Sequence, residues 1–307
     1  MRTIHHRPTG ASGTGFVDPA VLSRIDTLEL VARTVVDGFI NGLHHSPYLG
    51  LSLDFAEHRP YMPGDDIRRI DWRLYARTDR YYVKEFEADT NSNFMVLLDI
   101  SKSMDYGSGG LTKLDYARYL GASLAYFSHE QRDRVGLVTF DEGVVDYVPA
   151  SAKHLDVLLH TIDRVESTKA GRLKPALEKV SATLRRRGFI VLLSDFYEEP
   201  ESVIDAVQPL RYLGHDVIVF HIMDPAELEF PFEEAGSFED LESGEKIPIV
   251  PETQRARYRE LVQNHIATLG RMFTNERIDY AMFQTNQPLD YALFNYLSQR
   301  EKLSRVR

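Results

Sequence analysis

The segment that most constrains this chain is 94–107, FMVLLDISKSMDYG, in which an apolar run ends at an acid. Five consecutive apolar residues favour a buried strand, and a D-x-S-x-S pattern follows at its end. Such a strand would deliver Asp99, Ser101 and Ser103 onto one loop at the edge of a sheet. One carboxylate and two hydroxyls form a hard, oxygen-rich site, which predicts Mg²⁺ or another divalent cation such as Mn²⁺ or Ca²⁺.

A second acid stands at a comparable position. The apolar runs 134–140, 189–194 and 216–222 also predict buried strands, and helical patterns lie between them. This alternation predicts an α/β fold, with a mainly parallel central sheet covered by helices on both faces. Asp195 directly follows the run 189–194, and ligands of open α/β sheets bind at the carboxyl ends of strands. Asp99 and Asp195 would therefore meet if their strands are neighbours, with one or both acting through water and an open position left for an incoming carboxylate.

The D-x-S-x-S pattern also has a simpler interpretation. Asp99 could cap the turn that follows it, while the two serines satisfy local backbone amides. The apolar run before the pattern and the second acid at a strand end favour the metal site over this alternative.

Charge and composition exclude several classes of protein. The 307 residues carry a net charge of -10, which argues against a chain that coats nucleic acid. There is no cysteine, so disulfides and thiolate sites are excluded. No apolar run approaches the roughly 20 residues of a spanning helix, and residues 1–17 lack an apolar signal region. The sequence thus predicts a cytoplasmic protein without a membrane span.

The chain divides into three parts by pattern. Residues 1–17 are expected to be a disordered lead, and residues 18–92 an N-terminal segment that packs on the main domain and begins with a helix over 18–41. Residues 93–307 form the main α/β domain, with an acidic hairpin inserted near 228–250. A helix over 252–275, a strand over 278–285 and a helix over 289–300 are expected to complete it.

The run FMVLLDISKSM, followed by βα units and LLSDF, resembles the von Willebrand factor A domain with its metal-ion-dependent adhesion site. The wider chain resembles a bacterial family, domain of unknown function fifty-eight, through residues 57–87, 97–104 and 221–232. The resemblance covers about residues 40–300. It implies a six-stranded central sheet, with Asp99, Ser101 and Ser103 as first-loop metal ligands and Asp195 as the later acid. It also implies a partner, because members of the family are often found alongside MoxR-type AAA+ ATPases.

The chain departs from the adhesion-site pattern in one place. The pattern expects a threonine in the loop before the third helix, and the segment here is RVESTKAGRLKPALEKV. Thr168 is the nearest candidate, while Gly171 falls where the threonine often sits. Either Thr168 loops back to the metal, or the site lacks its third hydroxyl.

These features lead to three functional hypotheses. The first is an intracellular, metal-dependent interaction module that couples a MoxR-type ATPase to a protein client during assembly or maturation. The second is a metal-dependent hydrolase that uses the same acids, although no base is clearly placed for that role. The third is an extracellular adhesion module, which would need a secretion signal. We expect a binding protein and not an enzyme.

Overall fold

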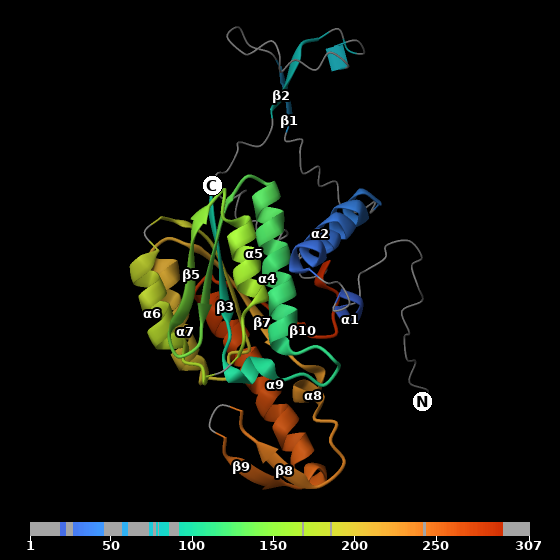
Figure 1. The fold of residues 1–307 in the computed structure, drawn as a ribbon, viewed down its shortest axis with the longest axis vertical. Helices are drawn as coiled ribbons and strands as arrows, with labels where there is room; N and C mark the ends of the chain where they lie inside the picture. Colours follow the sequence, from blue (N-terminus) through green and yellow to red (C-terminus); the bar gives the residue numbers. More distant parts are fainter. Residues whose placement is uncertain are drawn as a thin grey trace.

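The computed structural model describes residues 19–22, 27–45, 57–60, 74–75, 78, 80–85, 92–167, 169–184, 186–241 and 244–290. Its centre is a six-stranded sheet with helices on both faces (Figure 1). The strands are β3 (Asn93–Asp99), β4 (Arg134–Phe140), β5 (Val144–Ser151), β6 (Gly188–Ser194), β7 (Asp216–Met223) and β10 (Asp279–Gln284). The expected α/β fold is therefore confirmed.

The order of the strands across the sheet is β10-β7-β6-β3-β4-β5. All neighbours are parallel except β4 and β5, because β5 returns directly as an antiparallel edge strand. Numbered along the chain, this is the order 3-2-1-4-5-6 of doubly wound folds. The order reverses between β3 and β6, and the carboxyl ends of strands at such a switch point are where ligands bind.

Alternate residues of the strands feed two separate cores. Val96 and Leu98 of β3 join one cluster, which contains the apolar faces of α2 (Leu28–His45), α4 (Lys113–Glu130) and α5 (Leu155–Asp163). Met95 and Leu97 join the other, beneath α6 (Leu173–Thr183), α7 (Pro200–Tyr212) and α9 (Pro251–Asn275). Helices therefore cover both faces of the sheet, as the continuously apolar strand sequences predicted.

Two predicted helices need correction or fall outside the described residues, and one helix of the structure was not predicted. The helix expected over 18–41 is two helices, α1 (Pro19–Leu22) and α2, with residue 27 outside both. Helix α7 was not predicted, because Pro200 and Pro209 mask an apolar face that includes Val203 and Val207. The helix expected over 289–300 lies almost wholly outside the described residues.

The N-terminal part contributes a helix and a small sheet. Val31 and Val35 of α2 belong to the same apolar cluster as α4. Strands β1 (Glu57–Pro60) and β2 (Tyr82–Glu85) pair antiparallel in a sheet of their own. The disordered lead expected over residues 1–17 lies outside the described residues.

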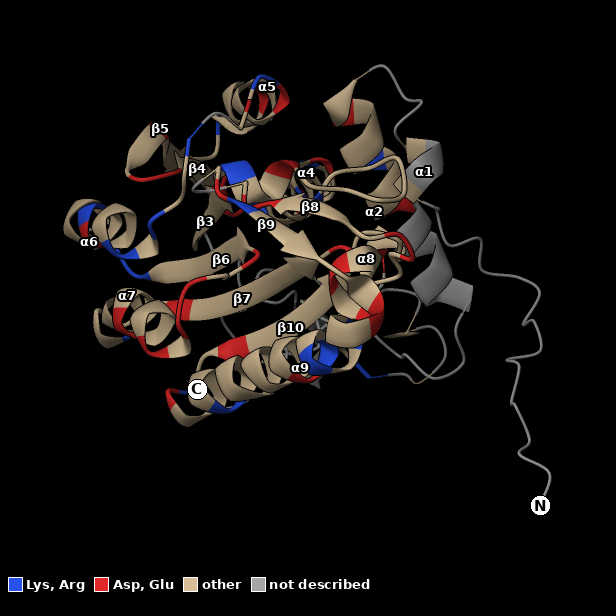
Figure 2. Cartoon of the chain, turned by 90° about the horizontal axis from the view of Figure 1, so that it is seen from below, with Lys and Arg blue, Asp and Glu red and all other residues tan. Residues whose placement is uncertain are grey.

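The predicted acidic insert lies beyond the carboxyl ends of the sheet strands (Figures 1 and 2). It begins with the short helix α8 (Pro225–Glu229) and contains the hairpin of β8 (Gly236–Glu239) and β9 (Lys246–Ile249). Rings from this insert and from α9 form an aromatic cluster of Phe230, Phe232, Phe238 and Tyr258. The guanidinium of Arg255 donates to the carbonyls of Phe230 and Phe232, which fixes the insert on α9.

Candidate metal centre

The two strand-end acids come together as the sequence predicted. Strands β3 and β6 are direct neighbours, and both Asp99 and Asp195 are buried at their carboxyl ends. Ser194 joins the two ends, since its hydroxyl donates to Oδ2 of Asp99 at 2.5 Å. The backbone N–H of Phe196 in turn donates to the Ser194 hydroxyl at 3.2 Å.

The D-x-S-x-S loop places its hydroxyls at a spacing that suits a cation. Ser101 and Ser103 are buried, and their hydroxyls form a hydrogen bond with the Oγ atoms 3.1 Å apart. Adjacent ligands of an octahedral Mg²⁺ with bonds of 2.0–2.1 Å lie about 2.9 Å apart, close to this separation. The backbone N–H of Ser101 donates to Oδ1 of Asp99 at 2.9 Å, so the capping role considered for Asp99 is also present. Each oxygen of Asp99 still has lone-pair capacity, and the two roles are compatible.

Burial makes the charge on Asp99 costly. Desolvation, assisted by repulsion from the nearby Asp195 carboxylate, raises the pKa of Asp99 to about 7. Hydrogen bonds from Ser194 and Ser101 act in the opposite direction. A bound cation would reverse this effect, because it favours the ionised carboxylate.

Asp195 already has a cation beside it. The ammonium of Lys113 lies 2.7 Å from Oδ2 of Asp195 and 2.7 Å from Oε1 of Glu227, and its side chain is fully buried. It also lies 4.4 Å from the centre of the Tyr197 ring and 3.4 Å from its hydroxyl. Burial alone would lower the pKa of Lys113, but the two carboxylates raise it above its ordinary value. Lys113 therefore stays charged.

The turn after Asp195 is held in an unusual conformation. Phe196 has a φ of 48°, in the left-handed region that few residues other than glycine adopt. His265 of α9 contacts its carbonyl oxygen through Nε2 at 2.8 Å, and the fully buried His221 packs edge-on against its ring. Burial, with His265 nearby, lowers the pKa of His221 to about 3, so this ring is neutral. These contacts hold the turn that follows Asp195 in place.

Asp224 anchors the end of the loop that carries Ser101 and Ser103, which we call the metal loop. Both the backbone N–H and the hydroxyl of Ser108 donate to its carboxylate, at 3.0 and 2.5 Å. The Thr285 hydroxyl and the N–H of Ala226 donate to the same group, at 3.1 and 2.8 Å. One buried acid thus joins the loop after Ser103, the start of α8 and the end of β10.

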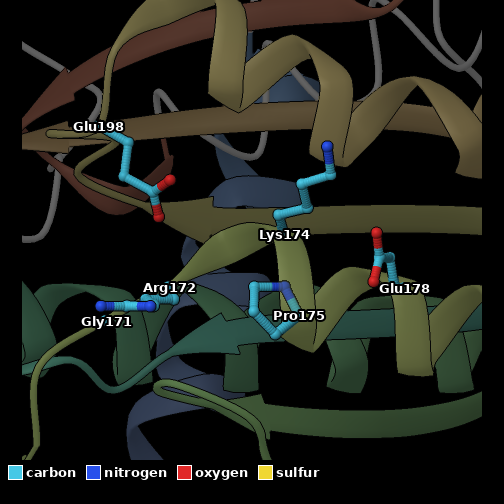
Figure 3. Close-up of a pocket in the computed structure, with 6 residues that line it drawn as sticks. All are labelled: Gly171, Arg172, Lys174, Pro175, Glu178 and Glu198. Carbon is cyan, nitrogen blue, oxygen red and sulfur yellow. The ribbon is translucent and has the colours of Figure 1, made fainter.

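A pocket of about 550 Å³ lies at the start of α6 (Figure 3). It lies between the segment before α6 and the segment after β6, and is lined by Gly171, Arg172, Lys174, Pro175, Glu178 and Glu198. The N–H of Lys102 donates to the carbonyl of Lys169 at 2.7 Å, so the first of these segments also contacts the metal loop. The carboxylate of Glu198 accepts from the N–H of Leu173 at 2.7 Å and closes one side of the pocket.

Comparisons with known proteins bear on the family. The family described as "Protein of unknown function DUF58" matches residues 57–268. An uncharacterised protein of Mycobacterium tuberculosis (strain H37Rv) is 31% identical over 234 residues, which cover 74% of this chain and 73% of that protein. The chain belongs to the DUF58 family.

Two solved structures are also similar to this DUF58 chain. A conserved hypothetical protein, BatB from Bacteroides thetaiotaomicron, aligns with a TM-score of 0.48 and 16% identity, over 68% of this chain and 98% of that one. The VWA domain of SpRpn10 aligns with a TM-score of 0.42 and 12% identity, over 65% and 92% of the two chains. In the part of the chain that the structure describes, no helix is long and apolar enough to cross a membrane.

The structure brings together four of the five ligands expected for this DUF58 member, namely Asp99, Ser101, Ser103 and Asp195. The fifth, Thr168, lies outside the described residues. The residues on either side of it touch the metal loop, because the Ser167 hydroxyl donates to the carbonyl of Ser101 and Lys169 accepts from Lys102. Whether Thr168 supplies the third hydroxyl stays a prediction.

Sequence reasoning missed three residues of the centre: Lys113, Ser194 and Glu227. Lys113 carried a usable signal, because it stands in the first turn of a helix capped by Thr112, where the helix dipole disfavours a cation. Within the described ranges, no group of three or more His, Cys, Asp or Glu side chains could hold a metal ion. The donors available are instead carboxylates and hydroxyls together, a set that suits Mg²⁺ and Mn²⁺ more than Zn²⁺.

Proposed function

We propose that this chain is a metal-dependent protein-interaction module. A divalent cation would be held by Asp99, Ser101 and Ser103, with Asp195 behind it and an open position for a carboxylate of the partner. The observation that carries this proposal is the pair of buried acids at the switch point of the sheet, beside two hydroxyls 3.1 Å apart.

The charge of the centre supports the proposal. When ionised, Asp99, Asp195 and Glu227 carry three negative charges, and Lys113 supplies one positive charge. Lys113 therefore offsets only one of these charges, and the buried acid Asp224 lies next to Glu227, so the centre keeps an excess of negative charge. Buried charges are costly unless they are paired, so the centre favours a divalent cation.

The burial of His221 favours binding over hydrolysis. His221 is fully buried beneath the turn and has no path to a substrate at the surface. We therefore place the chain among binding proteins, and metal-stimulated hydrolysis of a phosphoester would contradict that placement.

The pocket at the start of α6 offers a partner's chain a place to lie. Lys174 and Glu178 extend from α6 on one side, and Glu198 lies on the other (Figure 3). A segment whose acid reached the cation could place its neighbouring residues among these charged side chains. We propose a MoxR-type AAA+ ATPase as the partner and a further protein as its client, on the basis of the family alone.

The experiment is a pull-down from native cell extract, with Mg²⁺ or with a chelator. Wild type, Asp99→Ala and Asp105→Ala are compared, since Asp105 is an exposed acid on the same loop and serves as the matched control. Capture of an AAA+ ATPase by wild type and Asp105→Ala, with Mg²⁺ only, is the expected result. Capture that persists with chelator and with Asp99→Ala would place the interface elsewhere.

A further inference from the structure

Lys113 is an unusual residue for its position in the fold. It begins α4, directly after the capping residue Thr112, and its side chain is fully buried. A buried lysine is tolerated only when its charge is paired, and a buried ion pair adds little net stability over apolar residues of the same volume. Packing alone therefore gives no reason for a charge here, so its effect on the two carboxylates is the feature to explain.

The ammonium has all of its donors engaged. It donates to Asp195 and Glu227, both at 2.7 Å, and its third contact is the Tyr197 hydroxyl at 3.4 Å. Glu227 is fixed in turn, because its other oxygen accepts from the backbone N–H of Asp224 at 2.9 Å. Lys113 is thus clamped between the end of β6 and the start of α8.

This clamp determines what Asp195 can do for a cation. One oxygen of Asp195 is committed to Lys113, and direct ligation of a metal beside Asp99 would set the metal and the ammonium in competition for the same carboxylate. We propose that Lys113 is a positioning residue that keeps Asp195 out of direct contact with the cation, so that Asp195 acts through a bound water. This inference rests on the metal site proposed above.

The consequence is a cation that attracts a partner more strongly. If Asp99 were the one carboxylate in direct contact with a divalent ion, its direct ligands would offset one of the ion's two charges, whereas direct ligation by both acids would offset both. The remaining positive charge, together with exchangeable waters, is what an incoming carboxylate requires. Lys113 would therefore weaken metal binding by the free protein and strengthen partner binding by the metal-loaded protein.

Mn²⁺ alone tests this role in the full chain. Lys113→Met keeps an unbranched side chain, one atom shorter, and removes its charge, which frees Asp195 to ligate. We expect Mn²⁺ to bind about tenfold more tightly, because one nearby positive charge is gone. Water-proton relaxation should report at least one fewer water on the ion than in wild type. Lys113→Arg, which keeps the charge, should retain the wild-type number of waters.

The outcomes separate the role of Lys113 from the metal site itself. Unchanged Mn²⁺ affinity and hydration in a less stable Lys113→Met protein would overturn the proposal and leave Lys113 a structural residue. Absence of Mn²⁺ binding in wild type as well would overturn the metal site and, with it, this role. If Lys113→Met does not fold, adding Glu227→Leu removes the carboxylate left without a partner, and the same affinity and hydration measurements then decide.

Discussion

The carboxyl ends of β3 and β6 lie side by side, and each carries a buried aspartate, yet the two acids differ in their counter-ions. Asp195 has a lysine ammonium at 2.7 Å, whereas Asp99 has hydrogen-bond donors from Ser101 and Ser194. The pKa of Asp99 rises to about 7 as a result of burial and of Asp195. The difference is that a lysine of the protein lies beside the acid at one strand end, whereas at the other end the proposed metal ion would supply the positive charge.

The largest effect should come from removing the charge of Asp99. In Asp99→Asn, we expect the affinity for Mg²⁺ or Mn²⁺ to fall by more than about 100-fold, because the remaining oxygen ligands are neutral or engaged by Lys113. Without metal, the variant should be more stable than wild type at pH 8, by on the order of 2 kcal/mol, since a costly buried charge is gone. Calorimetric titration and thermal unfolding measure the two effects. Asp105→Asn is the control, and metal affinity close to that of wild type in Asp99→Asn would rule out the ligand assignment.

The pH dependence of stability and of metal binding gives a second test of the difference between Asp99 and Asp195. The folded-state pKa of Asp99 is above its ordinary value, so metal-free stability should fall as the pH rises from about 4 to about 7. Metal binding should follow the opposite trend, about tenfold weaker at pH 6 than at pH 8, because the cation must displace the proton. Mn²⁺ titrations across this range, with urea unfolding in parallel, measure both. A flat affinity profile would mean that Asp99 is ionised throughout.

Removing the hydroxyl of Ser103 should have a smaller effect on metal affinity, and it alters only the loop that follows β3. In Ser103→Ala, we expect metal affinity to fall about fivefold, because a water can replace the lost hydroxyl ligand at some cost in order. Ser108→Ala is the matched control, since its hydroxyl lies on the same loop but donates to Asp224. Equal losses of affinity in the two variants would indicate a general disturbance of the loop and not a lost ligand.

Ser194 connects the two strand ends and should produce the smallest change. Its hydrogen bond to Asp99 lowers the pKa of that acid, so Ser194→Ala should raise the midpoint of the metal-binding pH profile by about half a unit. Mn²⁺ titration over the same pH series as for wild type gives the shift. A midpoint that stayed fixed would show that the bond is weak in solution.

Much of this arrangement could be predicted from local patterns. Strand β4 occupies the predicted residues 134–140, and the apolar runs place Asp99 and Asp195 at strand ends because such runs stop where the chain leaves the core. Helix α7 was missed, since two prolines outweigh its apolar face in a reading of local signals.

The ion pairs of Lys113 could not be predicted in this way. Asp195 and Glu227 are 82 and 114 residues away in the chain, and only the packing of α4 against the end of the sheet and α8 brings them together. A lysine in an amphipathic helix is usually solvated, so its residue type predicts exposure to solvent and not the burial found here. The one local sign was its place in the first turn of α4, where acids are preferred.

The hydrogen bonds to Asp224 also affect the order in which a bound cation and a partner can leave the centre. They tie Ser108 to α8 and to Thr285, so the loop after Ser103 is not free to swing away from the sheet. A cation would then enter and leave through the solvent side, which a partner's carboxylate would cover. The ion would exchange quickly in the lone protein and stay trapped in the complex. Chelator added before binding would therefore prevent the complex, whereas chelator added afterwards would dissolve it no faster than the partner dissociates on its own.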